Sequence, residues 1–322
     1  MKTKRILILI THGLGELDVL FPLLCAIKKK YNCSIDMIFC INSVYYKYLE
    51  NEFYISTAKK INIQISKWYI PNKFDKQSKS KFKIFRLISR IQNLITIAVK
   101  TPFLIYKAIK SDFLFHEFSN QRQNTIGLKL ANSITKKKFF VYNHGHSLNQ
   151  KSKTIKKIKD ADKKIFLSFD KINREWEESL GYKMNFEIGF PKLYSEWTNF
   201  VLKNNNSYYQ NHIVIFSRKA DHPYYMGLKN YKFLFKNSYK AIREIFPENT
   251  IVIKPHPRED DDIINQLILS ERMSNIEISN NHAALLAKNS LVCISFWTSA
   301  IFDSLSLGVP TIEFFKEPYK ES

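Results

Sequence analysis

The sequence predicts an α/β protein with two parallel sheets, each covered by helices on both faces. Short, continuous aliphatic runs recur along the chain, for example at 6–10, 213–216 and 251–253. Runs of this kind are typical of parallel strands that are buried on both faces. Amphipathic helical patterns alternate with them, as a parallel sheet requires. A length of 322 residues suits two domains of ordinary size better than one.

The first predicted domain covers residues 1–200. It opens with a strand at 6–10, a glycine-containing loop at 11–15 and a helix at 16–30 that carries leucines on one face. The same alternation then continues, with helices expected at 126–134 and 171–180 and strands expected at 34–41, 112–118, 139–143, 165–169 and 186–191.

A basic helical insertion near 72–110 interrupts this pattern. Its polar, lysine-rich start leads into a predicted helix at 81–110, in which Phe85 and Ile91 alternate with Arg86 and Arg90. Such a helix can lie on an anionic membrane surface. An ordinary helix packed on the sheet, with a solvated basic face, explains the same pattern.

The polar run 204–206 marks the expected domain boundary, and the second domain is predicted to cover residues 207–322. Its expected helices are 234–245, 262–270 and 300–307, and its expected strands are 213–216, 251–253, 291–294 and 311–315. The chain stops soon after the last of these strands, which leaves open whether the C-terminus is truncated.

The composition narrows the classes of partner. Lysine and arginine number 50 against 29 acidic residues, a net charge of +21. This balance favours nucleic acid, acidic lipid, nucleotides or charged glycans, although compositional drift toward lysine explains part of it. No recognition helix, RNA-binding aromatic motif or zinc signature is present, so nucleic acid is not the expected partner.

The same sequence predicts no metal or other cofactor and a cytoplasmic location. The four cysteines form no CxxC pair, and the acidic run 260–262 is interpreted as a helix start. The apolar run after the N-terminus is too short for a signal peptide, and no apolar stretch is long enough to span a membrane. Peripheral attachment to the inner face of the cytoplasmic membrane remains open through the basic helix.

The segment Lys254-Pro255-His256-Pro257-Arg258 is the strongest candidate site. It follows the aliphatic run 251–253, where a buried strand ends. The prolines stiffen the backbone around His256. An imidazole between Lys254 and Arg258 suits a phosphate leaving group, whereas a surface histidine after a proline-terminated strand is the plainer alternative.

Hydroxyl side chains follow a neighbouring predicted strand. Ser295, Thr298 and Ser299 come just before the helix at 300–307, and Arg218 follows the strand at 213–216. Serine and threonine commonly cap helices, and a helix N-terminus also attracts anions. Because ligands of open α/β sheets bind outside the carboxyl ends of the strands, these residues predict a phosphate cradle.

Three residues of the first domain are candidates for acid–base catalysis. His144 stands at the end of a predicted strand, and Glu16 and Asp18 follow the first glycine loop. Any of them can assist deprotonation of an acceptor hydroxyl. A loop histidine bonded to the backbone, and acids that complement a helix dipole, are the alternatives.

Taken together, the chain resembles the two-Rossmann-domain GT-B transferases, in which the domains face each other across a cleft. It looks most like the superfamily of CDP-glycerol glycerophosphotransferases, bacterial polysialyltransferases and capsular Kdo transferases. The matching segments are His144-Gly145, Gly189-Phe190-Pro191, Lys254–Pro257 and Ser295–Pro310. Where the glycerophosphotransferases commonly show Asp-Tyr-Ser-Ser, this chain has Phe296-Trp297-Thr298-Ser299.

The resemblance implies a metal-independent glycosyltransferase for bacterial capsule or lipopolysaccharide synthesis. It would take a nucleotide-sugar donor, plausibly CMP-linked, and a glycan or lipid-linked acceptor. His256 and Ser299 would bind the donor phosphates, and His144 or a first-loop acid would act on the acceptor. A CDP-glycerol or ribitol phosphotransferase is the first alternative. A basic nucleic-acid- or membrane-binding protein without catalysis is the second.

Overall fold

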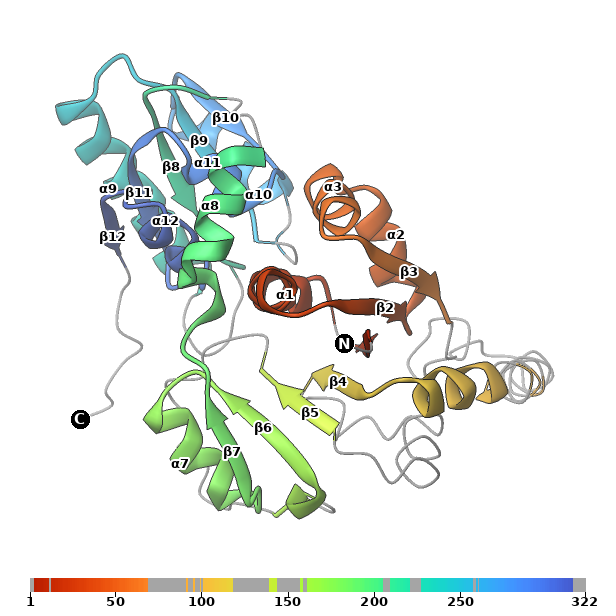
Figure 1. The fold of residues 1–322 in the computed structure, drawn as a ribbon. Coiled ribbons are helices and arrows are strands. Elements are labelled where there is room, and N and C mark those ends of the chain that lie inside the picture. The colour runs from red at the N-terminus through yellow and green to blue at the C-terminus, as the bar shows by residue number, and fades with distance from the viewer. Residues whose placement is uncertain are drawn as a thin grey trace. The chain divides into compact units, whose positions relative to one another are not determined.

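The computed structural model divides into two compact units, Met1–Pro191 and Lys192–Ser322, each built around one parallel sheet (Figure 1). The predicted α/β class with two Rossmann-like domains is confirmed. The structure describes residues 3–11, 13–68, 91, 95, 99, 101–117, 139–143, 157–158, 161–204, 209–220, 227–256, 259 and 261–314.

Among the described residues, the sheet of the first unit has seven strands in the order β3-β2-β1-β4-β5-β6-β7. Every pairing is parallel. The strand order reverses direction between β1 and β4, which is the point where ligands bind in open sheets of this kind. The strands are β1 (Lys4–Ile10), β2 (Cys33–Phe39), β3 (Ile63–Lys67), β4 (Phe113–Glu117), β5 (Phe139–Tyr142), β6 (Lys164–Ser168) and β7 (Met184–Glu187).

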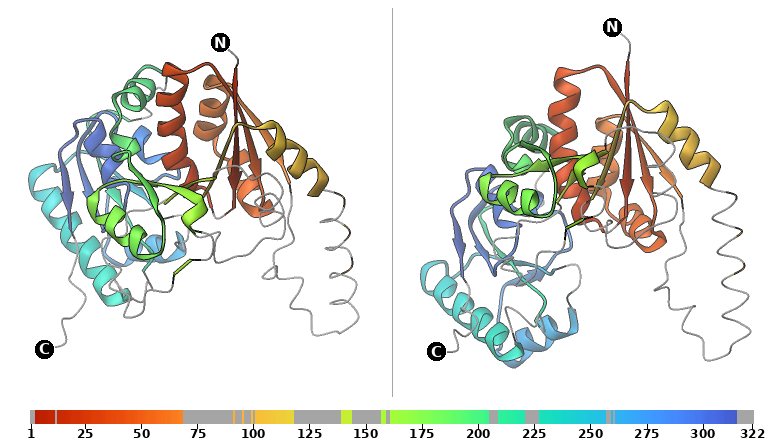
Figure 2. Two further views of the ribbon diagram at one scale, coloured as in Figure 1. Left: turned by 60° about the horizontal axis from the view of Figure 1, so that its bottom comes forward. Right: turned by 90° about the horizontal axis from the view of Figure 1, so that it is seen from below.

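Helices cover both faces of this sheet. Figure 2 shows α1 (Gly15–Lys30) on one face and the helical residues 101–110 on the other. Leu104 of the second helix packs in one buried cluster with Leu7 and Leu114 of the sheet, and that burial holds the helix in place. The remaining described elements are α2 (Asn42–Leu49), α3 (Glu52–Lys60), α7 (Lys171–Ser179) and short 3-10 turns at Ala161–Lys163 and Pro191–Leu193.

The second unit has a five-stranded parallel sheet in the order β10-β9-β8-β11-β12. The long helix α9 (Leu228–Ile245) buries Leu234 and Phe235 in one cluster with Ile213 and Ile253. The other elements are α8 (Ser195–Asn204), β8 (His212–Phe216), β9 (Ile251–Lys254), α10 (Asp261–Ser270), β10 (Ile276–Ile278), α11 (Ala283–Ala287), β11 (Ser290–Ser295), α12 (Ile301–Ser306) and β12 (Thr311–Glu313).

The boundary between the units falls after Pro191, earlier than the predicted polar run 204–206. Helix α8 therefore belongs to the second unit. Its Trp197 and Val201 are buried, and the Thr198 hydroxyl donates to the Ser306 carbonyl at 3.3 Å. Asn204, the first residue of the polar run, ends α8, and α8 packs within the second unit. A polar composition therefore does not mark the boundary here.

Several predicted segments lie outside the described residues. These are the helix at 126–134 and much of the insertion at 72–110. Residues 91, 95, 99 and 101–110 of the predicted basic helix are helical. Within the described part of the chain, no helix is both long enough and apolar enough to cross a bilayer.

Candidate functional site

Three candidate segments of the second unit meet at the carboxyl edge of its sheet. Lys254 ends β9 in register with Phe216 of β8, and Ser295 ends β11 in register with the same Phe216. The residues after these strands therefore emerge side by side, as the sequence predicted. Ser217 donates its amide to the Lys254 carbonyl at 3.1 Å, which continues the pairing past the strand ends.

Glu259, which the sequence analysis did not single out, holds the His256 loop to this edge. Its carboxylate accepts the backbone N–H of His256 at 2.8 Å and the hydroxyls of Ser217 and Tyr231. In return, the Glu259 amide donates to the His256 carbonyl at 2.8 Å. One carboxylate thus ties the end of β8, the helix α9 and the His256 loop together.

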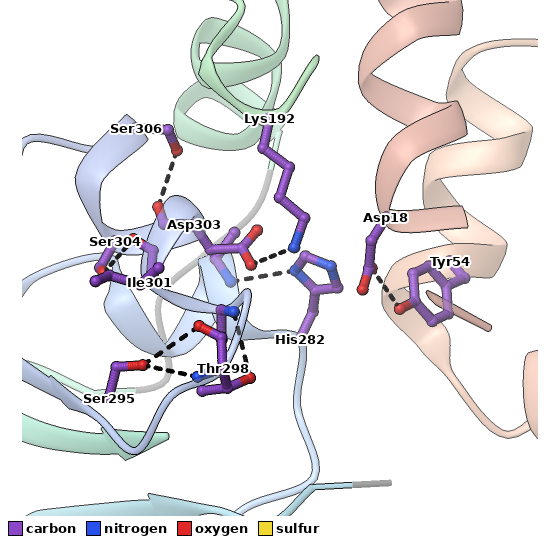
Figure 3. A network of polar contacts seen from close by, with 12 residues as sticks. Asp18, Tyr54, Lys192, His282, Ser295, Thr298, Ile301, Asp303, Ser304 and Ser306 are labelled. Atoms are coloured by element: carbon purple, nitrogen blue, oxygen red, sulfur yellow. Dashed lines mark hydrogen bonds and ion pairs between the residues drawn. The ribbon is translucent and has the colours of Figure 1, made fainter. Parts of the chain in front are cut away.

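The turn after β11 has its own internal support, drawn in Figure 3. The Thr298 amide donates to the Ser295 hydroxyl at 3.3 Å, and that hydroxyl donates to the Thr298 carbonyl. Ser295 is fully buried, so it braces the turn, whereas Ser299 is exposed. Trp297 has a φ of 52°, an unfavourable backbone region for a bulky residue that tends to occur at functional sites.

Arg218 connects this turn to the end of β8. Its guanidinium donates to the Trp297 carbonyl. Helix α12 then begins one residue later than predicted, at Ile301, and the Ala300 amide donates to the Thr298 hydroxyl at 3.4 Å. The carboxyl edge of this sheet therefore carries Lys254 and His256 after β9, Arg218 after β8 and the hydroxyl-bearing turn after β11, an arrangement that attracts anions.

A buried ion pair fixes the start of the second unit to α12. Lys192 Nζ lies 2.6 Å from Asp303 Oδ2 (Figure 3). Both side chains are almost completely removed from solvent, at 4% and 1% exposure. This pair anchors the segment that follows Gly189-Phe190-Pro191 to α12.

In the first unit, Glu16 is a structural link across the carboxyl edge of the sheet. It is fully buried, and one oxygen accepts the amides of Thr11 and Gly13 at 2.9 and 3.1 Å. The other oxygen accepts the hydroxyl of Tyr142, at the end of β5, at 2.9 Å. Burial, followed by the Glu16 carboxylate, raises the pKa of Tyr142 well above its usual value.

Asp18 is the more accessible of the two predicted acids. It lies two residues further along α1, is partly exposed, and accepts the hydroxyl of Tyr54 from α3 at 2.7 Å (Figure 3). The third predicted residue, His144, lies outside the described residues, as does Arg258 of the second unit. Their predicted roles therefore remain predictions.

Sequence reasoning missed other buried polar residues in the first unit. His116 and Glu117 end β4, next to the point where the strand order reverses, and both are buried. Burial, and then Lys164, lower the pKa of His116 to about 4, so this imidazole is neutral near pH 7. Only their positions on a central strand, which the topology reveals, distinguish them from surface polar residues.

Glu177 of α7 is the centre of a third buried polar group. Its carboxyl group accepts the amide side chains of Asn143 and Asn185 at 3.4 and 3.3 Å, and it also contacts the Ser168 hydroxyl. Burial raises the pKa of Glu177 to about 8. Ser168 also contacts the Asn185 side-chain oxygen. A protonated Glu177 can donate to the Ser168 hydroxyl oxygen, which leaves the single Ser168 proton for Asn185.

Replacement of Glu177 by glutamine is expected to remove a pH dependence of stability. The unfolded carboxyl ionises near pH 4.5, and the folded one ionises near pH 8. The contribution of this group is therefore complete below pH 4.5 and is lost as the pH rises through 8, with a slope of up to about 1.4 kcal/mol per pH unit. Urea unfolding of Glu177→Gln across this range should lack that slope.

The exposed neighbour on the same helix supplies the control. Glu178→Gln removes a carboxylate whose side chain is 53% exposed and should keep the wild-type slope. The test is the difference in free energy of unfolding between wild type and Glu177→Gln, because the lowered pKa of His116 gives both proteins an opposite slope below pH 6.5. A difference that is flat between pH 4.5 and 8 would contradict the protonated Glu177.

The described residues contain no group of three or more histidine, cysteine, aspartate or glutamate side chains placed to hold a metal ion. Their polar chemistry consists instead of cations, hydroxyls and backbone amides at the second sheet, and of buried carboxyl groups at the first. The cations, hydroxyls and amides at the second sheet suit an anionic ligand such as a phosphate.

Comparison with known proteins identifies the fold. No protein-family model and no curated protein matches the chain. Solved structures do match. A UDP-N-acetylglucosamine 2-epimerase from Rickettsia bellii has a TM-score of 0.53 at 15% identity, over 97% of this chain and 78% of that one. A glycosyltransferase from Rickettsia africae gives 0.52 at 12% identity, over 97% and 79%.

A plant enzyme has the same architecture. The Phytolacca americana UGT2 protein, complexed with UDP-2fluoro-glucose and pterostilbene, gives a TM-score of 0.52 at 9% identity, over 98% of this chain and 81% of that one. Identities this low establish the fold alone. The chain therefore has the GT-B fold of two Rossmann-like domains, and that fold carries both transferases and an epimerase.

Proposed function

We propose that the chain is a glycosyltransferase that uses a nucleotide-sugar donor, with the donor held by the second unit. The observation that carries this proposal is the convergence of Lys254, His256 and Arg218 at one sheet edge. Anionic ligands of open α/β sheets bind at such an edge. In the proposed reaction, an acceptor hydroxyl attacks the sugar carbon, and the bond to the departing nucleotide phosphate breaks.

The second unit would stabilise the charge that develops on that phosphate. Lys254, Arg258 and the His256 imidazole supply donors and positive charge, and Thr298 and Ser299 supply hydroxyls beside them. Preorganised donors of this kind need no rearrangement during the reaction. We further propose that the transfer needs no metal ion, since these cations take the role that a metal would otherwise have.

The acceptor would lose its proton to a base of the first unit. His144 and Asp18 are the better candidates. Glu16 is fully buried, and both of its oxygens already accept hydrogen bonds, so it is better suited to holding the loop. Asp18 is partly exposed and is oriented by Tyr54, which is what a general base requires.

The donor is proposed to be CMP-linked and the product a bacterial capsule or lipopolysaccharide, made at the inner face of the cytoplasmic membrane from a glycan or lipid-linked acceptor. The resemblance to polysialyl- and Kdo transferases supports this choice. A CDP-glycerol or ribitol phosphotransferase is the alternative on the same scaffold. It differs in the bond that breaks, since the phosphate itself is then transferred with its alcohol.

A nucleotide panel tests the proposal. Thermal unfolding is measured with CMP, CDP, UDP, GDP and ADP, because a ligand that binds the folded state raises its stability by about 2.7 kcal/mol at a hundredfold excess over Kd. A shift with CMP that His256→Ala abolishes supports a cytidine-linked donor, because a CMP-sugar transferase and a CDP-glycerol phosphotransferase both release CMP. Turnover of a CMP-sugar against that of CDP-glycerol then separates these two functions. No shift with any nucleotide would contradict the proposal.

Product analysis then separates transfer from isomerisation. The preferred nucleotide sugar is incubated with and without an oligosaccharide acceptor. Transfer predicts release of nucleotide that depends on the acceptor. Conversion of the donor sugar into an isomer without any acceptor would instead assign an epimerase activity, and the transferase proposal would be rejected.

A further inference from the structure

The helix that precedes β4 carries apolar side chains on two faces. One face buries Leu104 and Ala108 against the first sheet, as expected for a covering helix. Figure 2 shows the helical residues 101–110 covering one face of the first sheet, so a second face of this helix is left that does not pack on the sheet. A helix that covers a sheet usually presents charged and polar side chains on that second face.

Here the second face is apolar instead. We call it the apolar stripe, and its six helical residues are between 44% and 71% exposed. At 100° per residue, their positions fall within an arc of roughly 120°. The members are Ile91, Ile95, Val99, Phe103, Tyr106 and Ile109.

Scattered exposed apolar side chains are normal on protein surfaces, but a contiguous row on one face is not. Keeping such a row in water costs free energy in proportion to its apolar area. The stripe therefore indicates a surface that a binding partner covers in the functional protein. The charges around the stripe indicate the kind of partner.

All charged residues in the surrounding sequence are basic. Between residues 76 and 111 it holds lysines and arginines but neither aspartate nor glutamate. Lys107 pairs with Asp36 at 3.1 Å, whereas Lys110 is exposed, with its ammonium 5.9 Å from the ring of Tyr106. An apolar row next to the exposed Lys110, in a segment without acidic residues, matches an anionic lipid surface.

A second copy of this chain fits the stripe less well. Two copies joined through this face would bring two all-basic segments together, and like charges at an interface are unfavourable. An anionic bilayer removes this repulsion and also buries the apolar row. Charge complementarity thus favours lipid over self-association.

We propose that the apolar stripe is a membrane-docking surface for anionic phospholipid, with its aliphatic side chains at the level of the headgroups and Lys110 on lipid phosphates. The proposal names the residues behind the membrane location suggested above, and it rests on that proposed location rather than on the donor. It is independent of which group the chain transfers.

Vesicle sedimentation of the full chain tests this surface. The triple variant Ile95→Ser, Val99→Ser, Ile109→Ser removes three aliphatic members of the stripe. Its partition onto vesicles of phosphatidylcholine mixed with phosphatidylglycerol is expected to fall about tenfold or more relative to wild type. Wild-type binding should also weaken with added salt and be weaker on pure phosphatidylcholine.

A matched control variant carries Ile172→Ser, Ile245→Ser and Leu269→Ser, three aliphatic side chains that are equally exposed elsewhere. It should bind vesicles like wild type. Equal loss in both triple variants, or unchanged binding of the stripe variant, overturns the proposal. So does a wild-type dimer that the stripe variant disrupts while vesicles remain unbound.

The nucleotide response keeps this test separate from the proposed reaction. The stripe variant should show the same nucleotide-induced thermal shift as wild type, because no stripe residue lies in the second unit. A failure of the donor assignment leaves vesicle binding unchanged, and a failure of vesicle binding leaves the nucleotide shift unchanged.

Discussion

His256→Ala is expected to lower product formation by at least about 10²-fold while leaving the fold intact. The imidazole stands at the end of β9 on a loop whose backbone is held by Glu259 and is partly exposed at the sheet edge. Removing one preorganised donor to a developing charge typically has an effect of that size. Turnover is measured with the preferred nucleotide sugar, and circular dichroism and the melting temperature check folding.

Glu259→Gln separates positioning from direct contact. Glu259 accepts three hydrogen bonds, and an amide oxygen with a neighbouring NH₂ cannot accept all three in the same geometry. The expected result is a smaller loss than that of His256→Ala. If Glu259 acts through the His256 loop, the double variant loses no more than His256→Ala alone. Additive losses would show that Glu259 contributes independently of the histidine.

The elements that depend on local pattern were predictable from the sequence. The aliphatic runs became β1, β8 and β9 because continuous apolar segments of that length suit strands buried on both faces. β3 was not predicted, since its residues Ile63–Lys67 alternate apolar and polar side chains over too few positions to be distinguished from a loop. Its place at the edge of the sheet explains why one buried face suffices.

The candidate site was predictable only in part. Lys254 and Ser295 were expected at one edge, because the carboxyl ends of the parallel strands of a sheet share an edge, and the structure places them on either side of Phe216 in β8. Glu259 was not found, although a glutamate three residues after His256 has the spacing of a carboxylate that reaches back to a backbone amide. The link between Glu16 and Tyr142 joins residues far apart in the chain, so no local pattern could indicate it.

Lys192→Met is expected to destabilise the second unit by about 3–5 kcal/mol. It leaves Asp303 buried at 1% exposure with no cation, and Oδ1 of that carboxylate has no hydrogen-bond partner among the described residues. Desolvation of a carboxylate is costly, and the ion pair with Lys192 at 2.6 Å offsets that cost in the native protein. Urea unfolding measures the difference.

A second substitution distinguishes charge balance from lost packing. In Lys192→Met with Asp303→Leu, both charges are replaced by apolar groups of similar size, and most of the lost stability should return. The exposed pair Lys171–Glu175 is the matched control, since both side chains are more than 60% exposed and Lys171→Met should change stability by less than about 1 kcal/mol. A double variant as unstable as Lys192→Met would show that the lysine acts by packing. Recovery would show that the pair adds little net stability over an apolar substitute, although removal of one partner alone is costly.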